Sequence, residues 1–145
     1  MQLQTVNRDD AEATYGNFTN VQGATITTGY AVCFTTTAAS ANGNNAVLPA
    51  ANNIRTFAGI SMSDVADNAV GRYQAYGYNG SVFYFAEATS VSVTAGGHAA
   101  GPNASSLGVG YTGLSTAFGP VIILASLGAI VRSAGGYITG FIRAM

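Results

Sequence analysis

The sequence predicts an all-β fold, a single-domain β-sandwich or barrel. Three observations support this. Within Val70–Glu87, two aromatic-rich runs flank Asn79-Gly80, which suits a two-residue hairpin turn because both residues tolerate positive φ. β-Branched and aromatic residues recur in short runs, and 19 glycines separate these runs at short intervals. The length of 145 residues is typical of one domain.

The chain divides near residue 20 into an arm and a body. Residues 1–20 have few aliphatic side chains and no hydrophobic period, which indicates a segment ordered mainly by a partner. We therefore expect an extended N-terminal arm over residues 1–20 and a β-rich body over residues 21–145. The arm holds four of the charged residues, namely Arg8, Asp9, Asp10 and Glu12.

The body is expected to consist of short strands with turns between them. Its Thr, Ile, Val, Phe and Tyr residues suit a half-buried pleated surface. In Val121–Val131 both alternating sets of residues are apolar, which predicts one strand buried on both faces. The other expected strands are Ala24–Thr28 and Tyr30–Thr36 around a turn at Gly29, Val47-Leu48 at an edge before Pro49, Ile54–Met62, the two arms of the hairpin at Asn79-Gly80, Ser90–Ala95 and Tyr137–Ile142.

Charge is the unusual feature of the composition. Charged residues make up 8% of the chain, against about 25% in ordinary domains. A soluble monomer usually keeps its surface charged, so we expect other chains to cover much of this surface. The net charge of −1 and the lack of a basic cluster predict no nucleic-acid binding.

The sequence predicts no membrane segment and no disulfide. The N-terminus lacks the positive and apolar regions of a signal peptide. The longest apolar run, Val121–Val131, would span about 16 Å as a helix, which is half of a bilayer core. Cys33 is the single cysteine, so it has no partner for an internal disulfide and cannot build a cysteine-based metal site.

Motifs for catalysis or cofactors are weak. Gly108–Gly113 matches the glycine pattern of dinucleotide-binding folds, but Gly119-Pro120 follows too soon for the helix that this chemistry requires. His98 is the only histidine and lies in a glycine turn, which favours a turn residue over a catalytic one. Turn hydrogen bonds account for Asp64, Asp67 and Asn68 more simply than calcium does. We expect no enzyme activity, no metal and no cofactor.

One spacing of glycines and short strands runs through most of the chain. It comprises Asn20–Gly23 with Ile26-Thr27-x-Gly29, Phe57–Ile60, Ala69–Arg72, Gly80–Val82, Val93–Gly96 and Gly108–Gly110. This pattern resembles the capsid decoration (cement) proteins of tailed bacteriophages. The resemblance covers residues 20–131, and the segment after Arg132 is not clearly part of it.

The resemblance implies a jelly-roll-like β body that forms a homotrimer and binds the major capsid protein on the outside of a phage head. Such a protein is made in the host cytoplasm and resides in the virion. It implies capsid contacts through Arg8, Asp9, Asp10, Glu12 and Tyr15. The aromatic residues of the expected hairpin are then core or trimer contacts, namely Tyr73, Tyr76, Tyr78, Phe83, Tyr84 and Phe85.

Two other functions remain open at this point. One is another virion subunit, such as a minor capsid, fibre or tail protein. The other is a carbohydrate-binding β module, in which the same tyrosines would stack on sugars.

Overall fold

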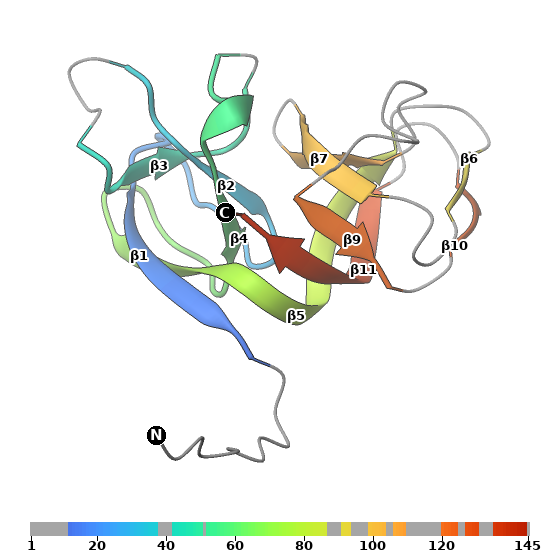
Figure 1. Cartoon of the computed structure of the whole chain (residues 1–145). Helices are drawn as coiled ribbons and strands as arrows, with labels where there is room; N and C mark the ends of the chain where they lie inside the picture. Colours follow the sequence, from blue (N-terminus) through green and yellow to red (C-terminus); the bar gives the residue numbers. More distant parts are fainter. Residues whose placement is uncertain are drawn as a thin grey trace, which may run out of the picture.

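The computed structural model describes residues 12–37, 42–50, 52–86, 91–93, 99–103, 106–109, 120–124, 127–130 and 135–144. In these residues the chain is all-β, with one short 3₁₀ turn and no α-helix, as predicted (Figure 1). The elements are β1 (Thr14–Asn20), β2 (Ala31–Phe34), β3 (Asn45–Val47), η1 (Ile54–Thr56), β4 (Phe57–Ser61), β5 (Val70–Ala86), β6 (Val91–Val93), β7 (Ala99–Asn103), β8 (Ser106–Val109), β9 (Val121–Ile123), β10 (Leu127–Ile130) and β11 (Gly135–Arg143).

Nine of the strands form one mixed sheet that closes on itself twice. Its order is β1-β3-β2-β4-β5-β11-β9-β7-β8, with further pairings of β1 to β5 and of β5 to β8. The first half of β5 therefore completes one five-stranded ring with β1, β3, β2 and β4. The second half completes another with β11, β9, β7 and β8. Figure 1 shows these two groups of strands on either side of β5.

The first ring encloses a compact aromatic and aliphatic cluster. Phe18 from β1, Val32 from β2 and Ala46 from β3 are buried here. Ile26 and Val65 lie just outside the strands, and their backbones exchange two hydrogen bonds of 2.9 and 2.8 Å. Burying side chains of this size stabilises the fold by about 1.5–3 kcal/mol each.

The second hydrophobic cluster is separated from the first by β2, which contributes a side chain to each cluster. Val82, Val121, Ile138 and their neighbours on β5, β9 and β11 pack together, and Ala31 of β2 and Ile60 of β4 join them. Successive residues of a strand point to opposite faces, so Val32 faces the first cluster and Ala31 the second. The two rings are therefore packed on each other and form one body.

The predicted hairpin at Asn79-Gly80 is wrong. β5 continues through both residues as a 17-residue strand. The strand bends instead at Gly77, whose φ of 106° favours glycine. A Cβ at Gly77 would also collide with the backbone of Glu12 and Ala13. Pairing with distant strands determines where β5 continues as a strand. Asn79 pairs with Gly140 on β11, so it remains in the strand and does not form a turn.

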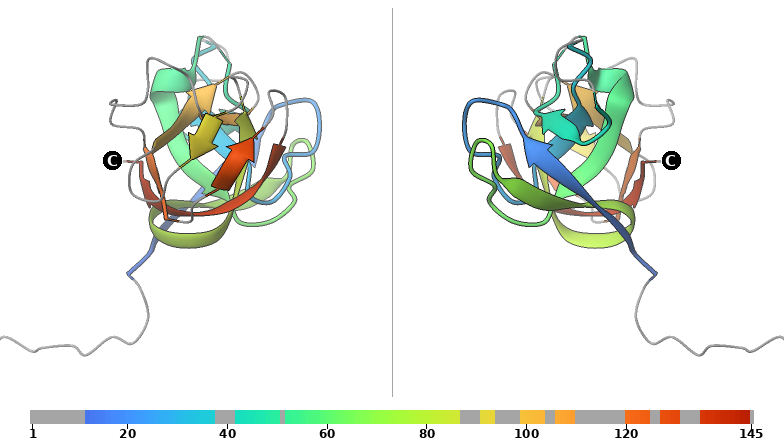
Figure 2. Two further views of the ribbon diagram at one scale, coloured as in Figure 1. Left: turned by 90° about the vertical axis from the view of Figure 1, so that its right-hand side faces the viewer. Right: turned by 90° about the vertical axis from the view of Figure 1, so that its left-hand side faces the viewer.

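The boundary between arm and body lies earlier than expected. Thr14–Asn20 form β1, which pairs with β5 along its length, and Phe18 is buried in the first ring. The body therefore includes residues 14–20, which the sequence assigned to the arm. The expected arm residues 1–11 lie outside the described residues. The N-terminal end of β1 points away from the body in both views of Figure 2.

The other predicted strands agree with the structure to different degrees. The turn at Gly29 (φ 84°) and the last strand, β11, are confirmed. The short strand before Pro49 forms as Asn45–Val47, but it lies between β1 and β2 and not at an edge as expected. Only the bridge at Ile26 forms within the expected strand 24–28. The expected strand 121–131 is divided, because β9 belongs to the large sheet while β10 pairs with β6 in a separate two-stranded sheet.

Candidate functional site

The aromatic residues of β5 divide between the core and the surface. Tyr84 is buried in the second cluster, and Tyr73 packs against the first, with its ring centroid 6.3 Å from that of Phe18. These two are core residues. Tyr78 is 51% exposed and Phe85 is 37% exposed, so both are available for contact. The two that remain, Tyr76 and Phe83, are half-buried.

The exposed members belong to a larger surface on the outside of the second ring. Tyr137 of β11 lies opposite Phe83 in the β5–β11 pair, and their rings meet edge to face with centroids 5.4 Å apart. The ring of Tyr30 stacks flat on the other side of Phe83, with a centroid distance of 4.3 Å. This arrangement fixes the aromatic rings before any partner arrives.

We call this surface the aromatic patch and define it by its exposed members, Tyr78, Phe85, Leu124 and Tyr137. Leu124 joins it because its backbone N–H donates to Thr139 of β11 at 2.9 Å. Two half-buried rings, Tyr76 and Phe141, pack edge to face with centroids 5.1 Å apart, and Phe141 lies opposite Tyr78 in the β5–β11 pair. None of the four defining residues is charged.

A second exposed apolar surface lies on the first ring. Met62 lies beside Arg72, since its N–H donates to the Arg72 carbonyl oxygen at 2.9 Å. The guanidinium carbon of Arg72 lies 4.0 Å from the centre of the Tyr15 ring, which is a cation–π contact. Val70, at the start of β5, is 73% exposed. We call Tyr15, Met62, Val70 and Arg72 the Arg72 patch.

The five expected capsid-contact residues are placed only in part. Arg8, Asp9 and Asp10 lie outside the described residues. Glu12 and Tyr15 are exposed at the start of β1, and Tyr15 belongs to the Arg72 patch. Five patch members were not assigned to a site from the sequence, because their exposure follows from strand pairing rather than from residue type, namely Met62, Val70, Arg72, Leu124 and Tyr137.

The carboxylates considered for calcium hold two loops together. Asp64 Oδ1 accepts hydrogen bonds from the N–H and the hydroxyl of Thr28, at 2.8 and 2.9 Å. These bonds lower the pKa of Asp64. Asp67 Oδ1 accepts the N–H of Gly23 at 2.8 Å. No group of three metal-ligating side chains occurs among the described residues.

The buried side-chain amide of Asn20 also links the two loops that Asp64 and Asp67 connect. The side-chain nitrogen of Asn20 donates to the carbonyl oxygens of Ala24 and Val65, both at 2.8 Å. Its oxygen accepts the N–H of Gln22 at 2.8 Å. Asn20 is completely buried, so these bonds satisfy a side chain that would otherwise destabilise the core.

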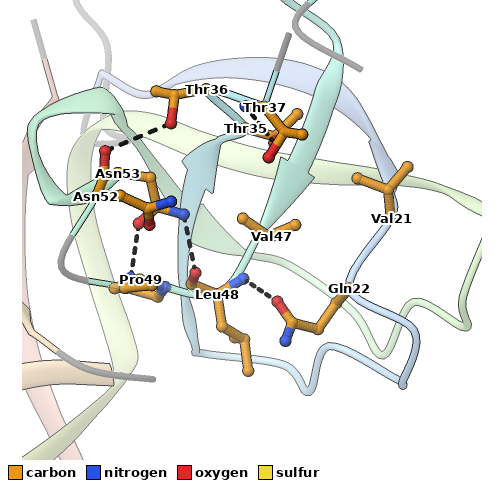
Figure 3. Close-up of a pocket in the computed structure, with 11 residues that line it drawn as sticks. Val21, Gln22, Thr35, Thr36, Thr37, Val47, Leu48, Pro49, Asn52 and Asn53 are labelled. Atoms are coloured by element: carbon orange, nitrogen blue, oxygen red, sulfur yellow. Dashed lines mark hydrogen bonds between the residues drawn. The ribbon is translucent and has the colours of Figure 1, made fainter. Parts of the chain in front are cut away.

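A shallow pocket of about 250 Å³ lies at the outer end of the first ring (Figure 3). Its walls carry only neutral side chains. Several of its polar groups hold the loops: Asn53 Oδ1 accepts the Ala50 N–H at 2.6 Å, and Gln22 Oε1 accepts the Leu48 N–H at 2.8 Å. The pocket has no nucleophile paired with a base. It is lined by Val21, Gln22, Thr35, Thr36, Thr37, Val47, Leu48, Pro49, Ala50, Asn52 and Asn53.

The remaining candidates supply no catalytic group in the part of the chain that the structure describes. Cys33 is fully buried, and burial raises its pKa to about 12. Gly108 and Val109 end β8, while the rest of the Gly108–Gly113 motif and His98 lie outside the described residues. No helix in the described segments is long and apolar enough to cross a membrane.

Comparison with known proteins adds no assignment. No protein-family model matches the sequence, and no curated protein matches it.

Proposed function

We propose that the chain is a structural subunit that decorates the head of a tailed phage. It assembles as a homotrimer, binds over the major capsid protein on the outside of the head and stabilises that lattice. The proposal combines the resemblance of residues 20–131 to decoration proteins with the surface described above. It assigns the protein no enzymatic reaction and no cofactor.

The observation that carries the proposal is a pair of exposed, mainly apolar patches on a chain of which only 8% of the residues are charged. A subunit in a closed ring of three buries two different faces, one toward each neighbour. Charged residues are depleted at the centre of such interfaces, and aromatic residues, Met and Arg are enriched. The aromatic patch and the Arg72 patch have this composition.

The architecture suits a structural role. The two closed rings of the large sheet leave few strand edges free for unwanted pairing. The start of β1 points away from the body, so residues that precede it can reach a neighbouring subunit of the capsid without disturbing either ring (Figure 2).

The direct test is to mix the purified protein with undecorated heads of the phage that encodes it. We expect a light-scattering mass of three chains in solution, saturable co-sedimentation with the heads and density at threefold positions in electron micrographs. A monomer that does not sediment with heads would contradict the proposal.

A glycan array run in parallel tests the carbohydrate-binding alternative. Saturable sugar binding that Tyr78→Ala removes would favour that function. Incorporation into tails or fibres rather than heads would instead favour another virion subunit.

A further inference from the structure

We infer that the aromatic patch of one copy binds the Arg72 patch of the next copy, in a head-to-tail contact. This inference rests on the proposed self-assembly and names the surfaces that perform it. The partner of each patch is thus a different patch of the same protein.

The position of the patches supports a head-to-tail contact. Val70 and Arg72 of the Arg72 patch lie on the first half of β5, and Tyr78 and Phe85 of the aromatic patch lie on the second half, with Gly77 between them. The two patches approach each other at Met62, whose Sδ lies 3.7 Å from the side-chain nitrogen of Asn79. Figure 1 shows the two halves of β5 with different strands on opposite sides of the molecule. A two-fold dimer needs one patch that contacts itself, whereas a ring needs two different patches.

The chemistry of the patches is complementary. Arg72 already lies over one tyrosine ring, and the other face of a guanidinium can stack on a second ring. The aromatic patch offers the exposed rings of Tyr78 and Tyr137, and the exposed Arg143 lies at its border, opposite Tyr76 in the β5–β11 pair. Two copies of the Arg72 patch would instead bring two cations together.

The exposed area also suits the centre of an interface. Tyr78 and Tyr137 are each 51% exposed and Phe85 is 37% exposed. At about 150–250 Å² for each aromatic side chain, these three leave roughly 300 Å² of ring surface in water. A standard interface buries about 800 Å² on each partner, with anchors of this kind at its centre and a neutral rim around them.

The test uses one charge in each patch. Tyr78→Glu alters the aromatic patch and Val70→Glu alters the Arg72 patch, and both side chains point into solvent. Ile54→Glu is the matched control, because Ile54 of η1 is 38% exposed and lies in neither patch. Leu124→Glu and Met62→Glu form a second pair. Circular dichroism and thermal melting confirm that each variant is folded.

Native mass spectrometry of the full chain gives the readout. We expect wild type and Ile54→Glu to be trimers, and Tyr78→Glu and Val70→Glu each to be monomers. An equimolar mixture of these two monomers should form heterodimers but no trimers. Each variant keeps one intact patch: Val70→Glu keeps its aromatic patch, and Tyr78→Glu keeps its Arg72 patch. These two patches can bind each other, but the heterodimer then has no intact patch left for a third copy.

The outcomes separate this inference from the proposed function. Trimers that persist in both pairs of variants would overturn the inference and leave self-assembly intact. Monomeric variants whose mixture forms no heterodimer would also overturn it, because the contact would then not join these two patches. Monomeric wild type at assembly concentrations would contradict the proposed function, and the inference with it.

Discussion

The side-chain amides of Gln74 and Asn79, five residues apart on one strand, are hydrogen-bonded to each other at 3.0 Å. Gln74 also donates to the carbonyl oxygens of Tyr76 and Tyr78, at 3.1 and 2.9 Å, and Asn79 accepts the Ser81 N–H at 2.8 Å. Gln74 is 1% exposed. These bonds hold the inside of the bend that joins the two rings.

Replacing Gln74 with methionine keeps the volume and removes this network. The carbonyl oxygens of Tyr76 and Tyr78 lose the Gln74 donor, and the Asn79 side-chain nitrogen keeps only its weak contact with Met62 Sδ at 3.7 Å. Each unsatisfied buried group costs about 1–3 kcal/mol. We expect Gln74→Met to lower the free energy of unfolding by roughly 2–4 kcal/mol in urea titrations. Gln22→Met, which alters an exposed glutamine, should cost much less; equal losses would contradict the role of the bend.

Gly77→Ala is expected to destabilise the protein at the same bend. The residue has a φ of 106°, and a Cβ there meets the backbone of Glu12 and Ala13. Gly23→Ala is the matched control, because Gly23 has a φ of 79° with open space around its Cβ position. An alanine at positive φ costs about 1–3 kcal/mol of stability in both variants. Gly77→Ala should lower the free energy of unfolding further than Gly23→Ala does, because only its Cβ clashes with neighbouring backbone. Equal melting temperatures of the two variants would contradict this.

The loop contact between Asp64 and Thr28 predicts a dependence of stability on pH. Hydrogen bonds from the Thr28 backbone and hydroxyl lower the pKa of Asp64 below its ordinary value of 3.8. The ionised form of Asp64 is therefore more stable in the folded state than in the unfolded state. This stabilisation is present above pH 3.8 and is lost as the pH falls through the lower folded pKa.

We expect wild type to melt above Asp64→Asn at neutral pH and this difference to shrink below pH 3.8. Differential scanning calorimetry at a series of pH values gives the measurement. A difference that grows on acidification would have the wrong sign and would rule out this linkage.

Cys33 is expected to resist thiol reagents in the folded protein. Its side chain is fully buried, and its pKa of about 12 leaves almost no thiolate at pH 8. The reaction with a chromogenic disulfide should be slow in buffer and fast in denaturant. Rapid labelling of the native protein would show that the wall between the two clusters opens readily.

Two deletions distinguish the arm from the body. Removing residues 1–11 leaves every strand of the first ring in place, so we expect a folded protein that binds phage heads less tightly. Removing residues 1–19 takes away all but the last residue of β1 together with Phe18, whose loss as a single Phe→Ala change costs about 3–5 kcal/mol. That deletion should unfold the protein, as circular dichroism would show. A stable fold without residues 1–19 would contradict the position of β1.

Residue preferences along the sequence predicted the fold class correctly, but they did not predict which strands pair with each other. The turn at Gly29 follows from residue preferences and formed as predicted. A strand also forms before Pro49, but it is paired on both sides, which residue preferences did not indicate. The Asn79-Gly80 signal failed because Gln74 and Gly140 engage Asn79 from positions that a local pattern does not show. The bend occurs at Gly77, where the flanking tyrosines gave no turn signal.

The candidate surface was predicted in part for a similar reason. All six aromatic residues of this run were predicted as core or trimer contacts, without a choice between the two; Tyr73 and Tyr84 belong to the core, whereas Tyr78 and Phe85 are exposed. An aromatic side chain suits both places equally, and only the bends and bulges of β5 decide which face each one occupies. Leu124 and Val70 became candidates only when the neighbouring strands were known.

Because both rings share β5, they can form only one after the other while the chain is being synthesised. The strands of the first ring lie within residues 14–76, so all of them have been made before the second half of β5. The second ring cannot close until β11 has been made, near the end of the chain. Until then Ala31 and Ile60 lack the side chains of β9 and β11 that cover them. The nascent chain therefore carries uncovered apolar side chains from the completion of the first ring until β9 and β11 have been made, which is the interval in which a chaperone or a neighbouring nascent copy can bind it.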